Sequence, residues 1–187
     1  MELSSLIESI LPFTEIISTI VLIITLWIMF KEFQRSNKVR RQDMYTNLEL
    51  SSIDLFKMVI EHPELKKIYN IKINKKLSDT ENKQLSEYTA SLLNLFEIHF
   101  NLRLSGDIDP IIFATWMPWL YELCRSEYFK KIWMDLQKHY VPRFRNFINS
   151  LIEVTENTKE PLKEKVFYER ASQLMDNDPI IKNWLTS

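Results

Sequence analysis

The side chains best suited to proton transfer or metal binding are three histidines: His62, His99 and His139. A di-iron centre in a helical bundle needs two Glu-x-x-His motifs on facing helices. The nearest match has Glu97 two residues before His99, which puts the two side chains on different helix faces. Asp135 and His139 share a face at i, i+4, but two ligands do not make a metal site. We therefore expect no metal and no cofactor, and a hydrogen-bonded His99 inside a bundle.

The run Gly106–Asp109 contains an Asp-x-Asp pair that could hold magnesium. Helix stop and start signals explain it better, because Gly106 suits a C-terminal cap and Asp109 an N-cap before Pro110. Cys124 has no helix N-terminus or second cysteine nearby and is expected to be a small buried hydrophobic residue. No G-x-S-x-G nucleophile elbow occurs. We expect no catalytic residues and no enzymatic activity; a hydrolase with an unfamiliar helical active site is the least favoured alternative.

Basic and aromatic side chains gather between residues 125 and 145. Such a surface could hold a nucleotide, a nucleic-acid strand or lipid headgroups. The alternative, which charge runs usually favour, is a solvated face over an aromatic core that includes Phe129 and Trp133. We expect no sequence-specific DNA binding. The candidate anion-binding residues are Lys130, Lys131, Lys138, Arg143 and Arg145.

An apolar segment, Ile10–Phe30, precedes all of these residues and carries one charge, at Glu15, among its 21 residues. As a helix it is about 30 Å long, the thickness of a hydrocarbon core. Its uncharged part, Ile16–Phe30, has only 15 residues, so a buried core helix is the alternative. A cleaved signal peptide fits poorly because the start is acidic. We predict a transmembrane helix with anchor residues Ile16, Ile20, Ile24, Trp27 and Phe30.

A basic collar follows the apolar segment directly. By the positive-inside rule it lies in the cytoplasm, which puts the N-terminus outside and the rest of the chain inside the cell. Each basic residue adds about 1 kcal/mol of attraction to anionic lipid. The predicted protein is a single-pass protein of the inner membrane. Its juxtamembrane lipid contacts are Lys31, Arg35, Lys38, Arg40 and Arg41.

Glycine occurs once, at Gly106, where typical usage of about 7% predicts roughly 13 residues. Dinucleotide-binding and P-loop folds need several glycines for close approach to phosphates, so both are excluded. The remaining sequence shows helical periodicity throughout and no sustained alternation of two residues. We predict an all-α fold in three parts: a lead-in, transmembrane helix and collar (1–41), a helical bundle (42–154), and a linker with a helical appendage (155–187).

Local signals set the predicted helix ends. A helix that continues the anchor should stop at His62-Pro63, because a residue before proline is disfavoured in the helical region. The sequence Ser78-Asp79-Thr80-Glu81 is a capping box that opens a helix over about 79–104. The helix after Asp109-Pro110 is predicted to run past Pro118 with a kink there.

Several aromatic and capping motifs resemble those of uncharacterised bacterial single-pass membrane-anchored proteins with a cytosolic all-helical domain. The motifs are His62–Tyr69, Asn94–Glu97, Trp116–Trp119, Phe129–Trp133 and Tyr140–Phe144. The resemblance covers roughly residues 10–150 and implies a bacterial inner-membrane protein, but no catalytic residues. Some small proteins of this layout are stress or phage-defence effectors, an analogy at the level of architecture.

Two functions are favoured by these patterns. The first is a non-enzymatic membrane module that binds a protein partner or forms a homo-oligomer and acts by assembly at the lipid bilayer. The second is a membrane effector that senses a nucleotide or another anion through the basic aromatic region.

Overall fold

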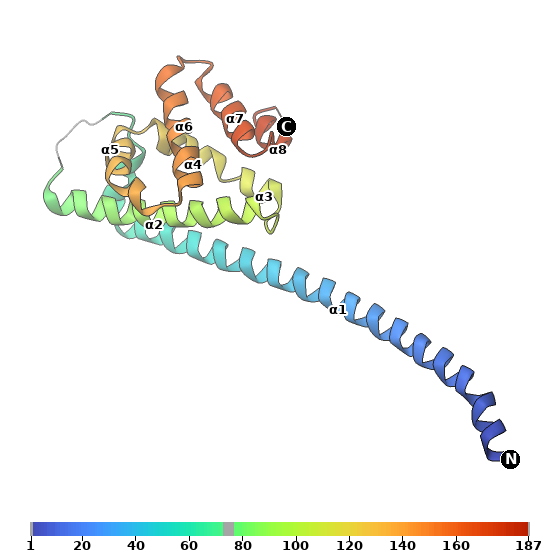
Figure 1. Ribbon diagram of the computed structural model, residues 1–187. Helices are drawn as coiled ribbons and strands as arrows, with labels where there is room; N and C mark the ends of the chain where they lie inside the picture. The colour runs from blue at the N-terminus through green and yellow to red at the C-terminus, as the bar shows by residue number, and fades with distance from the viewer. Residues whose placement is uncertain (1, 73–76, 187) are drawn as a thin grey trace. The chain divides into compact units, whose positions relative to one another are not determined.

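A computed structural model describes the backbone of residues 2–72 and 77–186 and, within the first 15 residues, only the side chain of Phe13. The described residues form eight α-helices and two 3-10 helices and contain no strand (Figure 1). The predicted all-α fold, a long apolar helix followed by a helical domain, is therefore confirmed. The chain divides into two compact units, Met1–Thr46 and Asn47–Ser187.

The helix α1 (Glu2–Glu61) supplies residues 2–46 of the first unit and residues 47–61 of the second. It stops where the sequence predicts, immediately before His62, whose φ of −125° and ψ of 74° lie outside the helical region. The proline that follows imposes this geometry on His62. Pro63 then opens the 3-10 helix η1 (Pro63–Tyr69), because its missing N–H costs nothing in a first turn.

The second unit continues through seven α-helices and a further 3-10 turn. They are α2 (Asp79–Leu104), α3 (Pro110–Ala114), α4 (Met117–Arg125), α5 (Glu127–Leu136), η2 (Gln137–His139), α6 (Pro142–Asn157), α7 (Lys163–Leu174) and α8 (Pro179–Lys182). Helix α6 packs against both α4 and α7, while α2 packs against η1, α3 and α5 (Figure 1). The result is a helical bundle in which α2 is the longest element after α1.

Capping fixes the ends of α2 as predicted. Ser78 Oγ accepts a hydrogen bond from the Glu81 N–H at 3.2 Å, and Glu81 Oε2 accepts one from the Ser78 N–H at 2.9 Å. Both halves of the capping box are thus formed. At the other end Gly106 has a φ of +74°, the left-handed geometry that favours glycine after a helix.

The predicted kink at Pro118 is wrong, because the chain breaks there into two helices. Helix α3 stops at Ala114, and Pro118 occupies the second position of α4. A proline interior to a helix would leave a carbonyl unpaired and would clash with the preceding turn, whereas in a first turn it does neither. Ending α3 early therefore removes the strain that a bent continuous helix would keep.

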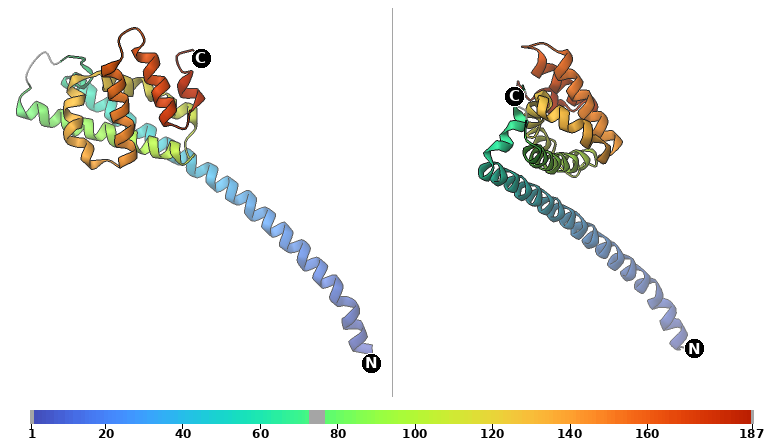
Figure 2. Two further views of the ribbon diagram at one scale, coloured as in Figure 1. Left: turned by 45° about the horizontal axis from the view of Figure 1, so that its top comes forward. Right: turned by 90° about the vertical axis from the view of Figure 1, so that its left-hand side faces the viewer.

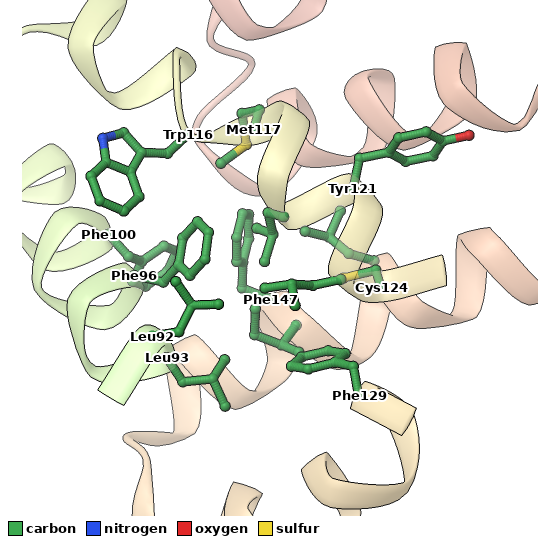
Figure 3. Close-up of a cluster of buried hydrophobic side chains, with 14 of the residues drawn as sticks. Leu92, Leu93, Phe96, Phe100, Trp116, Met117, Tyr121, Cys124, Phe129 and Phe147 are labelled. Carbon is green, nitrogen blue, oxygen red and sulfur yellow. The ribbon is translucent and has the colours of Figure 1, made fainter. Parts of the chain in front are cut away.

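The core of the second unit is built from α2, α4, α5 and α6. Figure 3 shows Leu92, Leu93, Phe96 and Phe100 of α2 directed toward side chains of the other three helices. The rings of Phe100 and Phe147 lie 4.9 Å apart between centroids. Phe129 and Trp133, predicted core residues, are buried, with 0% and 2% of their surfaces exposed.

The C-terminal segment, predicted as an appendage over 155–187, packs within the same compact unit. Helices α7 and α8 lie together beside α6 in the further views of Figure 2. Phe167 is fully buried and contacts Tyr121 of α4, with ring centroids 5.1 Å apart. Helix α6 runs to Asn157 and so extends into the predicted linker at 155–161.

Candidate functional site

The apolar part of α1 is uncovered within the described residues. The predicted anchor side chains are all at least half exposed: Ile16 57%, Ile20 50%, Ile24 51%, Trp27 61% and Phe30 57%. This stretch gives an 18-residue window with a mean hydropathy of 2.0, none of it buried. One described helix, near the N-terminus, is thus long and apolar enough to cross a membrane. A core helix would be buried, so the exposure argues against that alternative.

The basic collar lies on the same helix, directly after the apolar stretch. Lys31, Arg35, Lys38, Arg40 and Arg41 are all exposed. Lys31 Nζ lies 5.8 Å from the centroid of the Trp27 ring, within the range of a cation–π contact. An indole beside an ammonium group is the pairing expected at a membrane–water boundary, where one end of each side chain is apolar and the other wet.

The structure divides the five candidate anion-binding residues instead of bringing them together. Lys130 Nζ is paired with Glu156 Oε1 at 3.1 Å, near the C-terminal end of α6. Arg143 stands 13 positions earlier on α6, so it lies about 20 Å away along the helix. No single anion of ordinary size could contact both. Lys130 is also neutralised by its glutamate partner.

The remaining candidates cluster in sequence around the turn between α5 and α6. Lys131, Lys138 and Arg143 are exposed, and Arg145 is half-buried. A carboxylate already occupies the start of α6, where Glu97 Oε1 accepts a hydrogen bond from the Val141 N–H at 3.0 Å. An anion bound there would meet that negative charge. The basic region therefore remains a prediction, with Lys131, Lys138 and Arg143 as its exposed members.

His99 is placed as predicted, buried in the bundle with 1% of its surface exposed. Its Nδ1 lies 2.8 Å from the Leu95 carbonyl oxygen, and its ring contacts that of Trp116, with centroids 3.9 Å apart and planes tilted by 38°. Burial lowers the pKa of His99, while the bond to Leu95 and nearby Glu49 act in the opposite direction. Its Nε2 has no hydrogen-bond partner in the described chain. Over residues 2–72 and 77–186, no group of three metal-binding side chains converges.

The Asp-x-Asp pair and the cysteine serve the fold. Asp109 accepts a hydrogen bond from the Ile111 N–H at 2.8 Å and caps α3, as predicted. Asp107 instead accepts from the Ser105 hydroxyl at 2.7 Å. Cys124 is fully buried, as predicted, and burial raises the pKa of its thiol well above the ordinary value. A thiol held neutral in this way is a poor nucleophile.

A cavity in the second unit was not predicted. It has a volume of about 450 Å³ and lies where the end of α1 meets η1, α2 and α4. Its lining residues are Phe56, Val59, Lys66, Tyr69, Tyr88, Trp119 and Glu122. They come from four elements between Phe56 and Glu122, so no local sequence pattern marks them. In the structure Phe56 is exposed and Trp119 is partly buried, and neither property can be read from the sequence.

Comparison with protein-family models, with curated proteins and with solved structures finds no match to this chain.

Proposed function

We propose that this chain is a non-enzymatic single-pass membrane protein whose helical domain binds a protein partner or a second copy and acts by assembly at the bilayer. The exposure of the apolar stretch of α1, residues 16–30, carries the proposal. Twelve of these fifteen residues are exposed apolar side chains, which together make too large an apolar patch for water. Lipid suits both the apolar side chains and the backbone, because the backbone of a helix forms its hydrogen bonds internally.

The collar supports a defined orientation. Five exposed basic residues between Lys31 and Arg41 follow the apolar stretch, and positive charge near a membrane segment is retained on the cytoplasmic side. The proposed topology therefore has the N-terminus outside and residues 42–187 in the cytoplasm. The motif resemblance implies a bacterial protein, and the proposed membrane is then the inner membrane.

Assembly is supported by a second apolar surface, on the part of α1 that belongs to the helical domain. Leu50, Ile53 and Ile60 are 54%, 44% and 76% exposed. Their spacing places them within one side of the helix, whereas Leu48 and Ser52 on another side are buried. We name Leu50, Ile53 and Ile60 the α1 stripe. An exposed stripe of this kind suits pairing with another helix, and chains anchored in one membrane present it in the same orientation.

Carbonate extraction and cysteine labelling test the anchor and its orientation. The full chain is expected to stay in the membrane pellet at alkaline pH. Native Cys124 is buried and stays silent toward a membrane-impermeant maleimide, so single introduced cysteines can be read directly. Ser4→Cys should label in intact cells, and Asn157→Cys only after lysis. Release by carbonate would overturn the anchor, while the reverse labelling pattern would overturn the orientation alone.

A second candidate function is an anion-sensing membrane effector. It is favoured by Lys138 and Arg143, which are exposed and form no ion pair within the part of the chain that the structure describes. Thermal-shift measurements with nucleotides and cyclic oligonucleotides test it on the full chain. Charge reversal at Arg143 and Arg145 should abolish any stabilisation, and a shift that survives the reversal rules this region out as the site.

A further inference from the structure

The cavity beside the end of α1 has the dimensions and the chemistry of a small-molecule site. Its volume of about 450 Å³ lies within the range of roughly 300–1,000 Å³ typical of ligand pockets. Aromatic and aliphatic side chains dominate the lining, with few polar groups among them. A pocket of this composition binds a ligand through its apolar body and orients it through one or two polar contacts.

The aromatic wall of the cavity is supported from behind. Phe56 meets Trp119 edge to face, with ring centroids 4.7 Å apart and planes at 87°. Trp119 in turn contacts Trp116, with ring centroids 5.3 Å apart, and Trp116 contacts the buried ring of His99. Such a packed series of rings holds Trp119 in place before any ligand arrives, which reduces the entropy lost on binding. Phe56 remains 45% exposed, so apolar surface is still available for a ligand to cover.

The hydroxyl groups of the cavity are neutral. Tyr69 and Tyr88 are hydrogen-bonded to each other, and burial raises the pKa of both above the ordinary value. They can therefore donate or accept a hydrogen bond but add no charge near neutral pH. The net charge that a ligand meets is set by Lys66 and Glu122.

These two charges are not equivalent. Glu122 Oε1 lies 3.6 Å from Arg125 Nη1, and the same guanidinium also pairs with Glu160 through Nη2 at 3.4 Å. Lys66, in contrast, forms no ion pair within residues 2–72 and 77–186, and its neighbour Lys67 is bonded to Glu81 at 2.7 Å. Lys66 is thus the charged side chain of the lining that has no ion-pair partner within these residues. Charge complementarity favours an anion over a cation of the same shape.

We propose that this cavity binds a small organic anion with a flat apolar body, such as an aromatic carboxylate, with the body against Phe56, Val59 and Trp119 and the anionic group on Lys66. The site lies wholly within the unit Asn47–Ser187, so it does not depend on the proposed membrane insertion. Phe56 and Val59 belong to α1 and the other lining residues to η1, α2 and α4. A bound ligand would therefore join the end of α1 to the rest of the domain.

Calorimetric titration with a matched pair of probes tests the proposal. The probes are 2-naphthoate and 2-naphthylmethylammonium, which share an aromatic body and differ in the sign of their charge. The full chain is measured in nanodiscs of neutral lipid, with empty nanodiscs as the blank, or in plain buffer should it prove soluble there. We expect the carboxylate to bind about tenfold or more tightly than the ammonium.

Two variants separate the charge from the pocket. Lys66→Ala should weaken naphthoate binding about tenfold and strengthen ammonium binding, because a like charge is removed. Lys83→Ala, which changes an exposed lysine on α2 outside the lining, should alter neither affinity. Val59→Phe, which fills space in the cavity, should weaken both probes. Equal affinity for the two probes, preference for the ammonium, or no heat above the blank with the unaltered chain would each overturn the proposal.

Discussion

Asp178 combines two contacts that hold the C-terminal segment on the bundle. Its side chain is 1% exposed and accepts hydrogen bonds from Arg103 Nε at 3.1 Å and from the Ile180 N–H at 2.9 Å, which caps α8. Replacing Asp178 by Ala removes the cap and leaves Arg103, only 23% exposed, without its partner. We expect Asp178→Ala to lower the free energy of unfolding by about 3 kcal/mol, measured by urea unfolding with tryptophan fluorescence.

A surface ion pair provides the control for that substitution. Asp54 and Lys57 on α1 lie 3.0 Å apart but are 73% and 63% exposed. Solvent screens such a pair, so Asp54→Ala should cost less than about 0.5 kcal/mol. Similar losses for the two variants would show that the Arg103 contact does not stabilise the fold beyond an ordinary surface pair.

Protonation of His99 should destabilise the domain. Burial lowers its pKa below the value of 6.5 that the unfolded chain has, so below that pH the unfolded state takes up a proton that the folded state lacks. Stability is therefore fully present above pH 6.5 and falls as the pH drops toward the folded value, by up to about 1.4 kcal/mol per pH unit. His99→Phe, which keeps a ring against Trp116, should flatten the dependence of unfolding on pH between 7.5 and 5.

An exposed histidine separates this effect from a general response to acid. His139→Phe makes the same replacement at an exposed position and is measured in parallel as the control for the exchange itself. Parallel pH profiles for the unaltered chain and His99→Phe would mean that His99 is protonated equally in the folded and unfolded states.

At the scale of helices, the predictable features are those with a local cause. The stop at His62-Pro63, the capping box of Ser78 and Glu81, and the start at Asp109-Pro110 all depend on residues within four positions of each other. Backbone geometry and short-range hydrogen bonding determine such boundaries, so the sequence states them directly. The break before Pro118 was missed because proline permits either a kink or a new helix start, and packing decides between them.

Contacts between distant residues were beyond prediction from one sequence. Arg103 and Asp178 are 75 positions apart, and nothing near either residue indicates the other. The same limit applies to the candidate sites. Closeness in sequence places Lys130 with Arg143, whereas the ion-pair partner of Lys130 is Glu156, near the C-terminal end of α6. The antiparallel course of α5 and α6, also marked by the bond from Trp133 Nε1 to Asn149 at 2.7 Å, separates what the sequence places together.

A substitution in the apolar stretch of α1 tests whether this helix is inserted in lipid. Ile24 lies in the middle of residues 16–30 and is 51% exposed. A charged lysine at the centre of a membrane helix costs about 2.5–3.5 kcal/mol in insertion. Ile24→Lys should move a large fraction of the chain from the carbonate-resistant membrane pellet to the supernatant. Immunoblots of the two fractions measure this change.

Ile60→Lys is the matched change on the same helix. Ile60 is 76% exposed and lies 30 positions beyond Phe30, outside the apolar stretch. The variant should fractionate like the unaltered chain. Should Ile24→Lys remain in the pellet as fully as Ile60→Lys, burial of residues 16–30 in lipid would be contradicted.

For the whole molecule, α1 links the two proposed activities, because it carries the apolar stretch in one compact unit and the α1 stripe in the other. Tethering in a membrane confines copies to two dimensions and aligns them, which raises the effective concentration of one stripe for another. A helix pair of low affinity can then be largely associated in the membrane without any further contact. The ligand cavity contains Phe56 and Val59 of the same helix, so a bound anion would act on the element that assembles.

Disulfide crosslinking in membranes tests assembly through the α1 stripe. Ile53 lies on the stripe, whereas Ser51 is also exposed but lies about 160° away around the helix, at 100° per residue. Under mild oxidation Ile53→Cys should give a covalent dimer on non-reducing gels and Ser51→Cys should stay monomeric, since buried Cys124 does not take part. Adding Leu50→Glu to Ile53→Cys should reduce the dimer severalfold, because it places like charges face to face in a parallel pair. Equal crosslinking at both positions would indicate random collision, and none at Ile53 would exclude pairing through this stripe.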